Sequence, residues 1–162
     1  AQVMAIDWTL NYQWTELFNI GIITEIYDYN TVFEESFSIA PIEKRAALSG
    51  LWDNERWRIN SSASWVEKRD LSKYGYAGFD LKDRSSIKPD TAPGYLNIDM
   101  KIVYQLSDKI KLYFGALNLL DYNQASDESS PLLFNEYGGY DVTYIYAPMR
   151  GRTAYLGFDL EL

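Results

Sequence analysis

The feature that most constrains this chain is an alternation of apolar and polar residues that recurs in several separate segments. In the first segment, apolar side chains occupy every second position from Ile6 to Trp14, and polar residues such as Asp7 and Asn11 lie between them. A period of two residues places successive side chains on opposite faces of a β-strand, whereas a helix repeats about every 3.6 residues. The pattern therefore predicts strands with one apolar and one polar face.

The same alternation predicts seven strands in all. They cover residues 6–14, 18–26, 46–52, 57–65, 96–106, 110–116 and 154–162. Tight turns are predicted near 15–17, 53–55 and 107–109, and long connections near 28–42, 67–93 and 121–149. All five prolines lie in the long connections, where they deprive no strand of a backbone donor. We expect an all-β fold, an antiparallel up-and-down meander of about seven strands with no convincing helix, whose long connections share one end of the sheet.

Composition excludes several classes of function. A formal net charge of -8 provides no basic surface for nucleic acid. The chain has no Cys and no His, which excludes thiolate and imidazole metal sites and the nucleophilic mechanisms that depend on these residues. No apolar run approaches the roughly 20 residues of a membrane-spanning helix. We expect no catalysis, no cofactor, no metal site and no nucleic-acid partner.

Alternation alone also describes a soluble sandwich or lipocalin-like barrel, but the distribution of charge and aromatic residues favours a membrane barrel. The apolar stripes contain no charged residue, and most of them cover about 9 to 11 residues, the length of a tilted membrane-crossing strand. The opposite faces carry both signs, which suits a wet interior: Asp7, Glu25, Arg45, Arg56, Arg58, Asp99, Lys101, Lys111, Asp159 and Glu161. Aromatic residues beside the tight turns predict an interfacial girdle, or else packing at hairpin ends: Trp14, Phe18, Trp52, Trp57 and Tyr104.

Three short motifs lie near the end of the chain. Residues 114–121 read Phe-Gly-Ala-Leu-Asn-Leu-Leu-Asp, and residues 146–152 read Tyr-Ala-Pro-Met-Arg-Gly-Arg. The last motif consists of Tyr155, Gly157, Phe158, Leu160 and Leu162. The first two are similar to the penultimate strand and the Pro-Gly-Arg approach to the final strand in TonB-dependent receptors. The third resembles the C-terminal signal read by the outer-membrane assembly machinery, although it ends on Leu instead of an aromatic residue.

This resemblance implies that residues 1–162 are the C-terminal segment of a receptor barrel of about 22 strands, without its plug domain. Bacterial barrels have an even number of strands, so seven would form only part of one. The implied function is active transport of a scarce nutrient, such as an iron-siderophore, across the outer membrane of a Gram-negative bacterium. The implied partners are outer-membrane lipid, the plug domain and remaining barrel strands, TonB acting through the plug, and a small nutrient ligand. The strand pattern leaves open a soluble lipocalin-like barrel that binds a small hydrophobic molecule.

Two arginines and four tyrosines are candidate ligand contacts. Arg56 and Arg58, two residues apart on one predicted strand face, can clamp an anionic chelate, or they pair with carboxylates of neighbouring strands. Aromatic residues of the long connections can stack on a ligand, or pack on their own loops: Tyr74, Tyr76, Tyr137 and Tyr140. The polar group at Asp121, Asn123, Asp127 and Glu128 lacks the glycine and the bidentate Glu of a known Ca²⁺ loop, so no metal site is predicted there.

Overall fold

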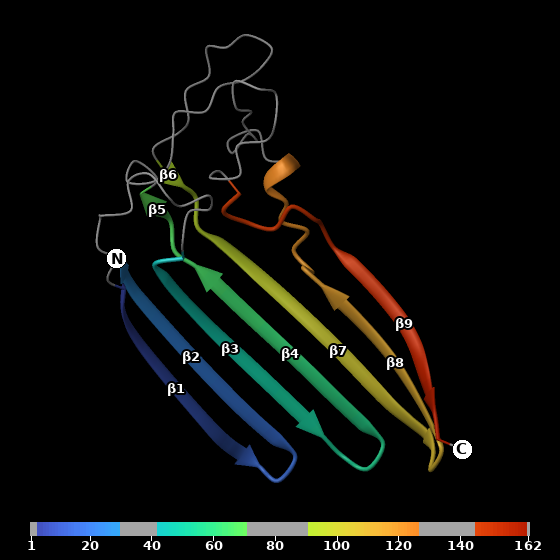
Figure 1. Ribbon diagram of the computed structural model, residues 1–162. Coiled ribbons are helices and arrows are strands. Elements are labelled where there is room, and N and C mark those ends of the chain that lie inside the picture. Colours follow the sequence, from blue (N-terminus) through green and yellow to red (C-terminus); the bar gives the residue numbers. More distant parts are fainter. Residues whose placement is uncertain (1–2, 30–41, 71–90, 127–144, 162) are drawn as a thin grey trace.

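The computed structural model describes residues 3–29, 42–70, 91–126 and 145–161. They form an antiparallel sheet of seven strands in the order β1-β2-β3-β4-β7-β8-β9, together with a separate two-stranded ladder, β5-β6 (Figure 1). The main strands are β1 (Val3–Thr15), β2 (Phe18–Tyr29), β3 (Lys44–Asp53), β4 (Trp57–Val66), β7 (Tyr95–Ser107), β8 (Ile110–Leu117) and β9 (Thr153–Leu160). Every neighbour in the main sheet is the next of these strands along the chain, so the predicted seven-stranded meander is confirmed.

The register brings all the predicted apolar stripes to one face. Leu10 pairs with Ile22, and Ile22 pairs with Leu48. At the other side of the sheet, Phe114 of β8 pairs with Leu156 of β9. Because directly paired residues of neighbouring strands point to the same side of the sheet, these pairs join into one continuous apolar face. The alternate residues form a polar face on the other side.

The apolar face has no second layer against it in the described part of the chain. Side chains of the edge strands are the most open, with Leu156 exposed to 80% and Phe158 to 67%. Strands in the middle of the sheet also leave large side chains uncovered, such as Leu48 at 51%. In a soluble sandwich these residues would be the core, whereas a transmembrane barrel leaves them for lipid.

The two ends of the sheet differ as the lengths of the connections predict. The tight turns after β1, β3 and β7 lie together at one end, which we call the turn end, and the described parts of the long connections lie at the other, the loop end (Figure 1). The loop end also holds two features that were not expected. Residues of the predicted 67–93 connection form the short strands β5 (Arg69–Asp70) and β6 (Thr91–Ala92), and η1 (Gln124–Ser126) is a 3-10 turn.

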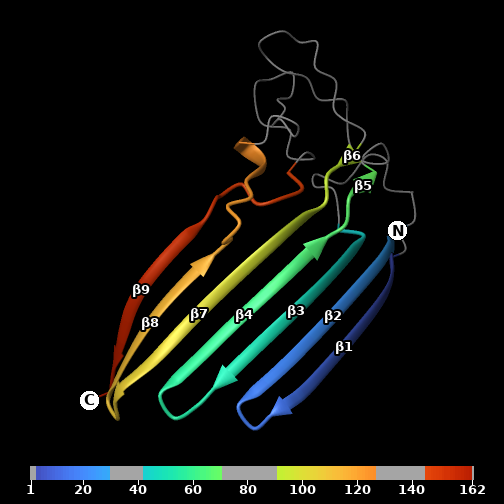
Figure 2. The same ribbon diagram turned by 180° about the vertical axis from the view of Figure 1, so that it is seen from behind.

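The sheet is open in the described residues. β1 pairs with β2 alone and β9 with β8 alone, and the view from behind shows these two strands at opposite margins (Figure 2). Each margin leaves a row of backbone donors and acceptors that a further strand can pair with. No helix in the described residues has the length and apolarity to cross a membrane.

Candidate functional site

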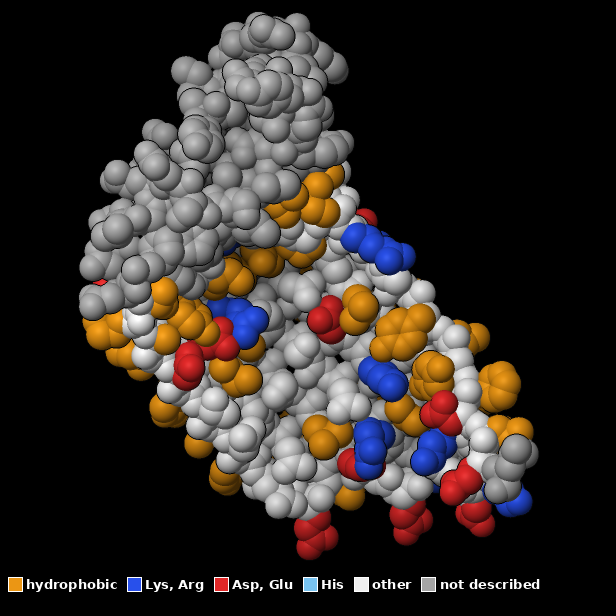
Figure 3. All heavy atoms as spheres, viewed as in Figure 1, with side chains coloured by type: hydrophobic (Ala, Val, Ile, Leu, Met, Phe, Trp, Pro, Cys, Tyr) orange, Lys and Arg blue, Asp and Glu red, His pale blue; other side chains and the backbone are white. Residues whose placement is uncertain are grey.

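The polar face carries a hollow of about 620 Å³. Asn11 of β1 and Tyr155 of β9 both line it although these strands lie at opposite margins of the sheet, so the sheet curves around its polar face. Figure 3 shows this face, where charged side chains of both signs stand around a centre of uncharged polar groups. The lining residues on the polar face are Asn11, Gln13, Asn19, Gly21, Ser49, Leu51, Asn60, Ser62, Asp99, Lys101, Leu117 and Tyr155. Most are amides, hydroxyls or small residues, so the hollow favours hydrogen bonds with a polar partner over strong charge interactions.

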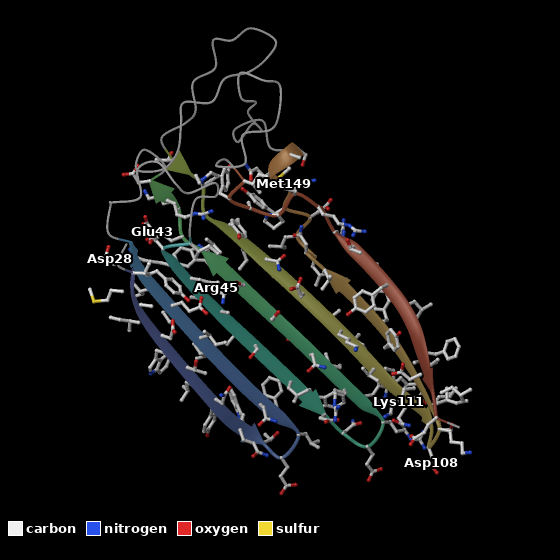
Figure 4. The ribbon with its side chains drawn as sticks, in the orientation of Figure 1. Asp28, Glu43, Arg45, Asp108, Lys111 and Met149 are labelled. Carbon is white, nitrogen blue, oxygen red and sulfur yellow. The ribbon has the colours of Figure 1, made fainter. Side chains whose placement is uncertain are left out.

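Charges on the polar face pair across neighbouring strands. Glu25 and Arg45 are direct register partners, with Arg45 Nε 2.8 Å from Glu25 Oε2 and Nη2 2.7 Å from Oε1. This two-pronged geometry is the strong form of an ion pair. Figure 4 shows that Arg45 lies toward the loop end, whereas Lys111 lies close to the turn end.

The structure places Arg56 and Arg58 close together at the turn end. Arg58 lies on the polar face, and its Nη2 is 2.6 Å from Oδ2 of Asp53, its register partner. Arg56 lies before β4, in the turn, where its backbone N–H donates to Asn54 Oδ1 at 2.9 Å. Arg56 lies one residue before β4 (Trp57–Val66), and its carbonyl accepts a hydrogen bond from the Gln105 N–H of β7 at 2.7 Å. Both arginines line a small hollow of about 190 Å³ at the turn end, and their contact with a ligand stays a prediction.

Several other predicted residues lie outside the described part of the chain. They are Tyr74, Tyr76, Tyr137, Tyr140, Asp127, Glu128 and Leu162. Their proposed contacts stay predictions. Within the described ranges, no group of three or more potential ligand side chains is arranged to hold a metal ion.

The predicted girdle residues gather at the turn end. Phe18 pairs with Trp52 in the register, and Trp57 pairs with Tyr104 at a ring-centroid distance of 4.5 Å. Trp14 lies 6.5 Å from Phe18 by the same measure. These amphipathic rings thus form a row where the apolar face ends, which is the position of an interfacial belt.

A buried polar joint at the loop end was not predicted from the sequence. Its centre is Gln124, whose side chain has no exposed surface. Gln124 Oε1 accepts hydrogen bonds from the backbone N–H groups of Tyr146 (3.0 Å) and Ala147 (3.2 Å). The backbone N–H of Gln124 donates to the carbonyl of Pro148 at 3.0 Å. One side chain therefore ties η1 to the segment that leads into β9.

Arg69 connects this joint to the preceding long connection. The residue is 2% exposed, and its Nη2 donates to the carbonyl oxygen of Tyr146. Its guanidinium carbon lies 5.7 Å from the centre of the Tyr146 ring, within cation-π range. Since Arg69 belongs to β5, it joins the base of the 67–93 connection to the base of the next one.

The Asn-Leu-Leu-Asp motif has a structural explanation in the same joint. Asn118 and Asp121 have φ values of 53° and 60°, a left-handed conformation that Asn and Asp tolerate better than most residues. Asn118 Nδ2 donates to the carbonyls of Tyr122 (2.7 Å) and Arg150 (3.1 Å). Asp121 Oδ1 accepts from the N–H of Arg152 at 2.6 Å. The motif thus fixes the end of β8 to the beginning of β9.

The C-terminal motif divides between the two faces. Phe158 and Leu160 lie on the exposed apolar face, whereas Tyr155 and Gly157 lie on the polar face. There the Tyr113 ring covers Gly157 and the Tyr155 ring covers Gly115, so that a Cβ on either glycine would overlap the ring. Each tyrosine ring thus packs on a glycine of the neighbouring strand. This packing is the reason that position 157 of the motif is a glycine.

We expect Gly157→Ala to lower the free energy of unfolding of the full-length protein by about 1 to 3 kcal/mol, because the added methyl must displace the Tyr113 ring. Urea titration of the protein folded into lipid vesicles measures this. The same change made in a Tyr113→Ala background should cost much less. Equal costs in the two backgrounds would contradict the packing explanation.

Comparisons with known proteins give a clear result only for structure. No family model matches the sequence, and no curated protein matches it either. The ferric-catecholate import receptor Fiu from E. coli K12 superposes with a TM-score of 0.62 at 14% identity, over 98% of this chain and 20% of the receptor. The structure of the FpvAI-pyocin S2 complex matches with a TM-score of 0.59 at 10% identity, over 98% of this chain and 19% of that one.

The chain has the fold of a segment of the barrels in these two structures. It spans about one fifth of the length of these receptor structures. The predicted all-β meander, as part of a larger barrel, is confirmed.

Proposed function

We propose that residues 1–162 are the C-terminal wall segment of a TonB-dependent receptor that imports a scarce nutrient, such as an iron-siderophore or a similar ligand, across the outer membrane. The single observation that carries this proposal is the two-faced curved sheet. Its exposed side is predominantly apolar and its hollow side is polar. A barrel continued from this sheet has lipid outside and a wet lumen inside.

The direction of curvature is the argument against a soluble carrier of hydrophobic molecules. Such a barrel would bind its ligand on an apolar concave side and leave polar residues for bulk water. Here amides and hydroxyls such as Asn60 and Ser62 line the hollow, whereas Leu156 and Phe158 lie on the outside. In water, so large an apolar surface would drive association.

The proposed partners follow from the two faces and the open margins. Outer-membrane lipid covers the apolar face, and further strands of the same barrel pair with β1 and β9. A plug domain occupies the polar hollow, which offers it hydrogen-bonding groups such as Asn11 and Asn60. TonB acts through that plug. The small nutrient ligand enters from the loop end, and the receptor transports it without chemical change.

A pair of single cysteines tests the membrane placement. The chain has no cysteine, so Met100→Cys and Lys101→Cys each introduce a sole reactive thiol into these 162 residues. In vesicles, a fluorophore at position 100 should be quenched strongly by a lipid-soluble quencher, and one at position 101 weakly, because neighbouring residues of β7 face opposite sides. Equal quenching at the two positions would refute the proposed placement.

A further inference from the structure

A second hollow, of about 510 Å³, lies at the loop end between the beginning of β7 and the segment that follows β8. Its aromatic wall consists of Tyr95 and Tyr122, whose rings stack at a centroid distance of 5.3 Å and an angle of 7°. The other lining residues are Gly94, Leu96, Leu120, Asp121, Asn123 and Ser126. Apolar, aromatic and hydrogen-bonding groups therefore meet in one small site.

This hollow is continuous with the apolar face. Leu96 pairs with Trp65 in the register, so it belongs to that face at its loop-end limit. Leu120 lies beyond the sheet and is 52% exposed. If the apolar face contacts lipid, as the proposed function requires, the hollow lies where acyl chains give way to headgroups.

The segment that leads into β9 brings the backbone of two exposed arginines to the edge of the hollow. Arg150 and Arg152 are held there by their backbones, through the hydrogen bonds of the Arg150 carbonyl to Asn118 and of the Arg152 N–H to Asp121. Figure 3 shows basic side chains at the loop end of β9, above the apolar side chains of that margin. The ion pairs found in the described residues involve other arginines and a lysine. These two guanidinium groups are therefore available to an anion.

We propose that this loop-end hollow, with Arg150 and Arg152, binds a phosphorylated glycolipid of the outer leaflet. Leu96 and Leu120 contact the acyl chains, and the arginines bind phosphate, for which the guanidinium fork is suited. Asn123 and Ser126 offer hydrogen-bonding groups to sugar hydroxyls, and the Asp121 carboxylate accepts from hydroxyls while repelling phosphate from its own side. Basic pockets at the membrane interface recognise lipid headgroups in this way.

The proposal rests on the proposed function and is tested on the full-length protein in detergent. A bisphosphorylated glucosamine-disaccharide lipid, its dephosphorylated form and phosphatidylglycerol are titrated, and bound lipid is counted by native mass spectrometry. The wild type should prefer the phosphorylated glycolipid. Arg150→Gln with Arg152→Gln should weaken its binding about tenfold or more, as expected for the loss of charge-assisted hydrogen bonds. Leu120→Glu should also weaken it, because a carboxylate then faces the acyl chains.

The matched control is Lys109→Gln with Lys111→Gln, which removes the same charge at the turn end and should leave binding unchanged. The proposal is overturned if the arginine variant binds like the wild type, if the lysine variant loses as much, or if phosphatidylglycerol binds equally well. Failure of the proposed function is distinguished by the cysteine pair at positions 100 and 101. Differential quenching there, without glycolipid selectivity, overturns only the glycolipid site.

Discussion

Arginine in place of Ser61 should lower the free energy of unfolding from a bilayer by about 2 to 4 kcal/mol, which is the cost of a guanidinium on the lipid face near the midplane. Ser61 lies in the middle of β4, on the apolar face between Gly50 and Met100. The next residue, Ser62, lines the polar hollow. Ser62→Arg should therefore cost only a small part of that amount.

This pair is closely matched, because the native residue, the substitution and the strand are the same. Reversible unfolding of both variants from lipid vesicles gives the two free energies. Refolding in detergent micelles supplies a control, since a micelle adapts around a charge and should narrow the difference. Similar losses for Ser61→Arg and Ser62→Arg in vesicles would contradict the assignment of the apolar face to lipid.

The second large effect is expected at Gln124. Replacement by leucine removes the acceptor of two backbone N–H groups, those of Tyr146 and Ala147. A buried donor without a partner costs about 1 to 3 kcal/mol. Because two donors lose their acceptor, Gln124→Leu should lower the free energy of unfolding by roughly 2 to 6 kcal/mol. Urea titration in vesicles measures the loss, and hydrogen exchange of the two amides locates it.

Ser126→Ala is the control for this effect, because Ser126 belongs to the same 3-10 turn but is exposed. It should cost less than about 0.5 kcal/mol, as most surface substitutions do. In Gln124→Leu, faster hydrogen exchange should also extend to the backbone amides around Arg69, because Arg69 contacts Tyr146 from the base of the 67–93 connection. Unchanged exchange at Tyr146 and Ala147 in Gln124→Leu would show that Gln124 does not hold the joint.

The sequence by itself determined the seven strands of the main sheet, their order and the face to which most of their side chains belong. Period-two alternation is a local property, so Leu112, Phe114 and Phe158 could be assigned to one face without knowledge of their neighbours. The connection lengths then separated the turn end from the loop end. The Asn-Leu-Leu-Asp motif was found in the same way, although its contacts were not.

Only the tertiary structure decided which way the sheet curves and what holds the loop end together. Curvature depends on the summed twist of all the strands, and it places the polar face inside. The contact of Arg69 with Tyr146 joins residues 77 positions apart, and neither lies in a repeating pattern. Hydrogen bonds of this kind depend on chain geometry in three dimensions, not on spacing, and for that reason Gln124 and Arg69 could not be predicted as buried.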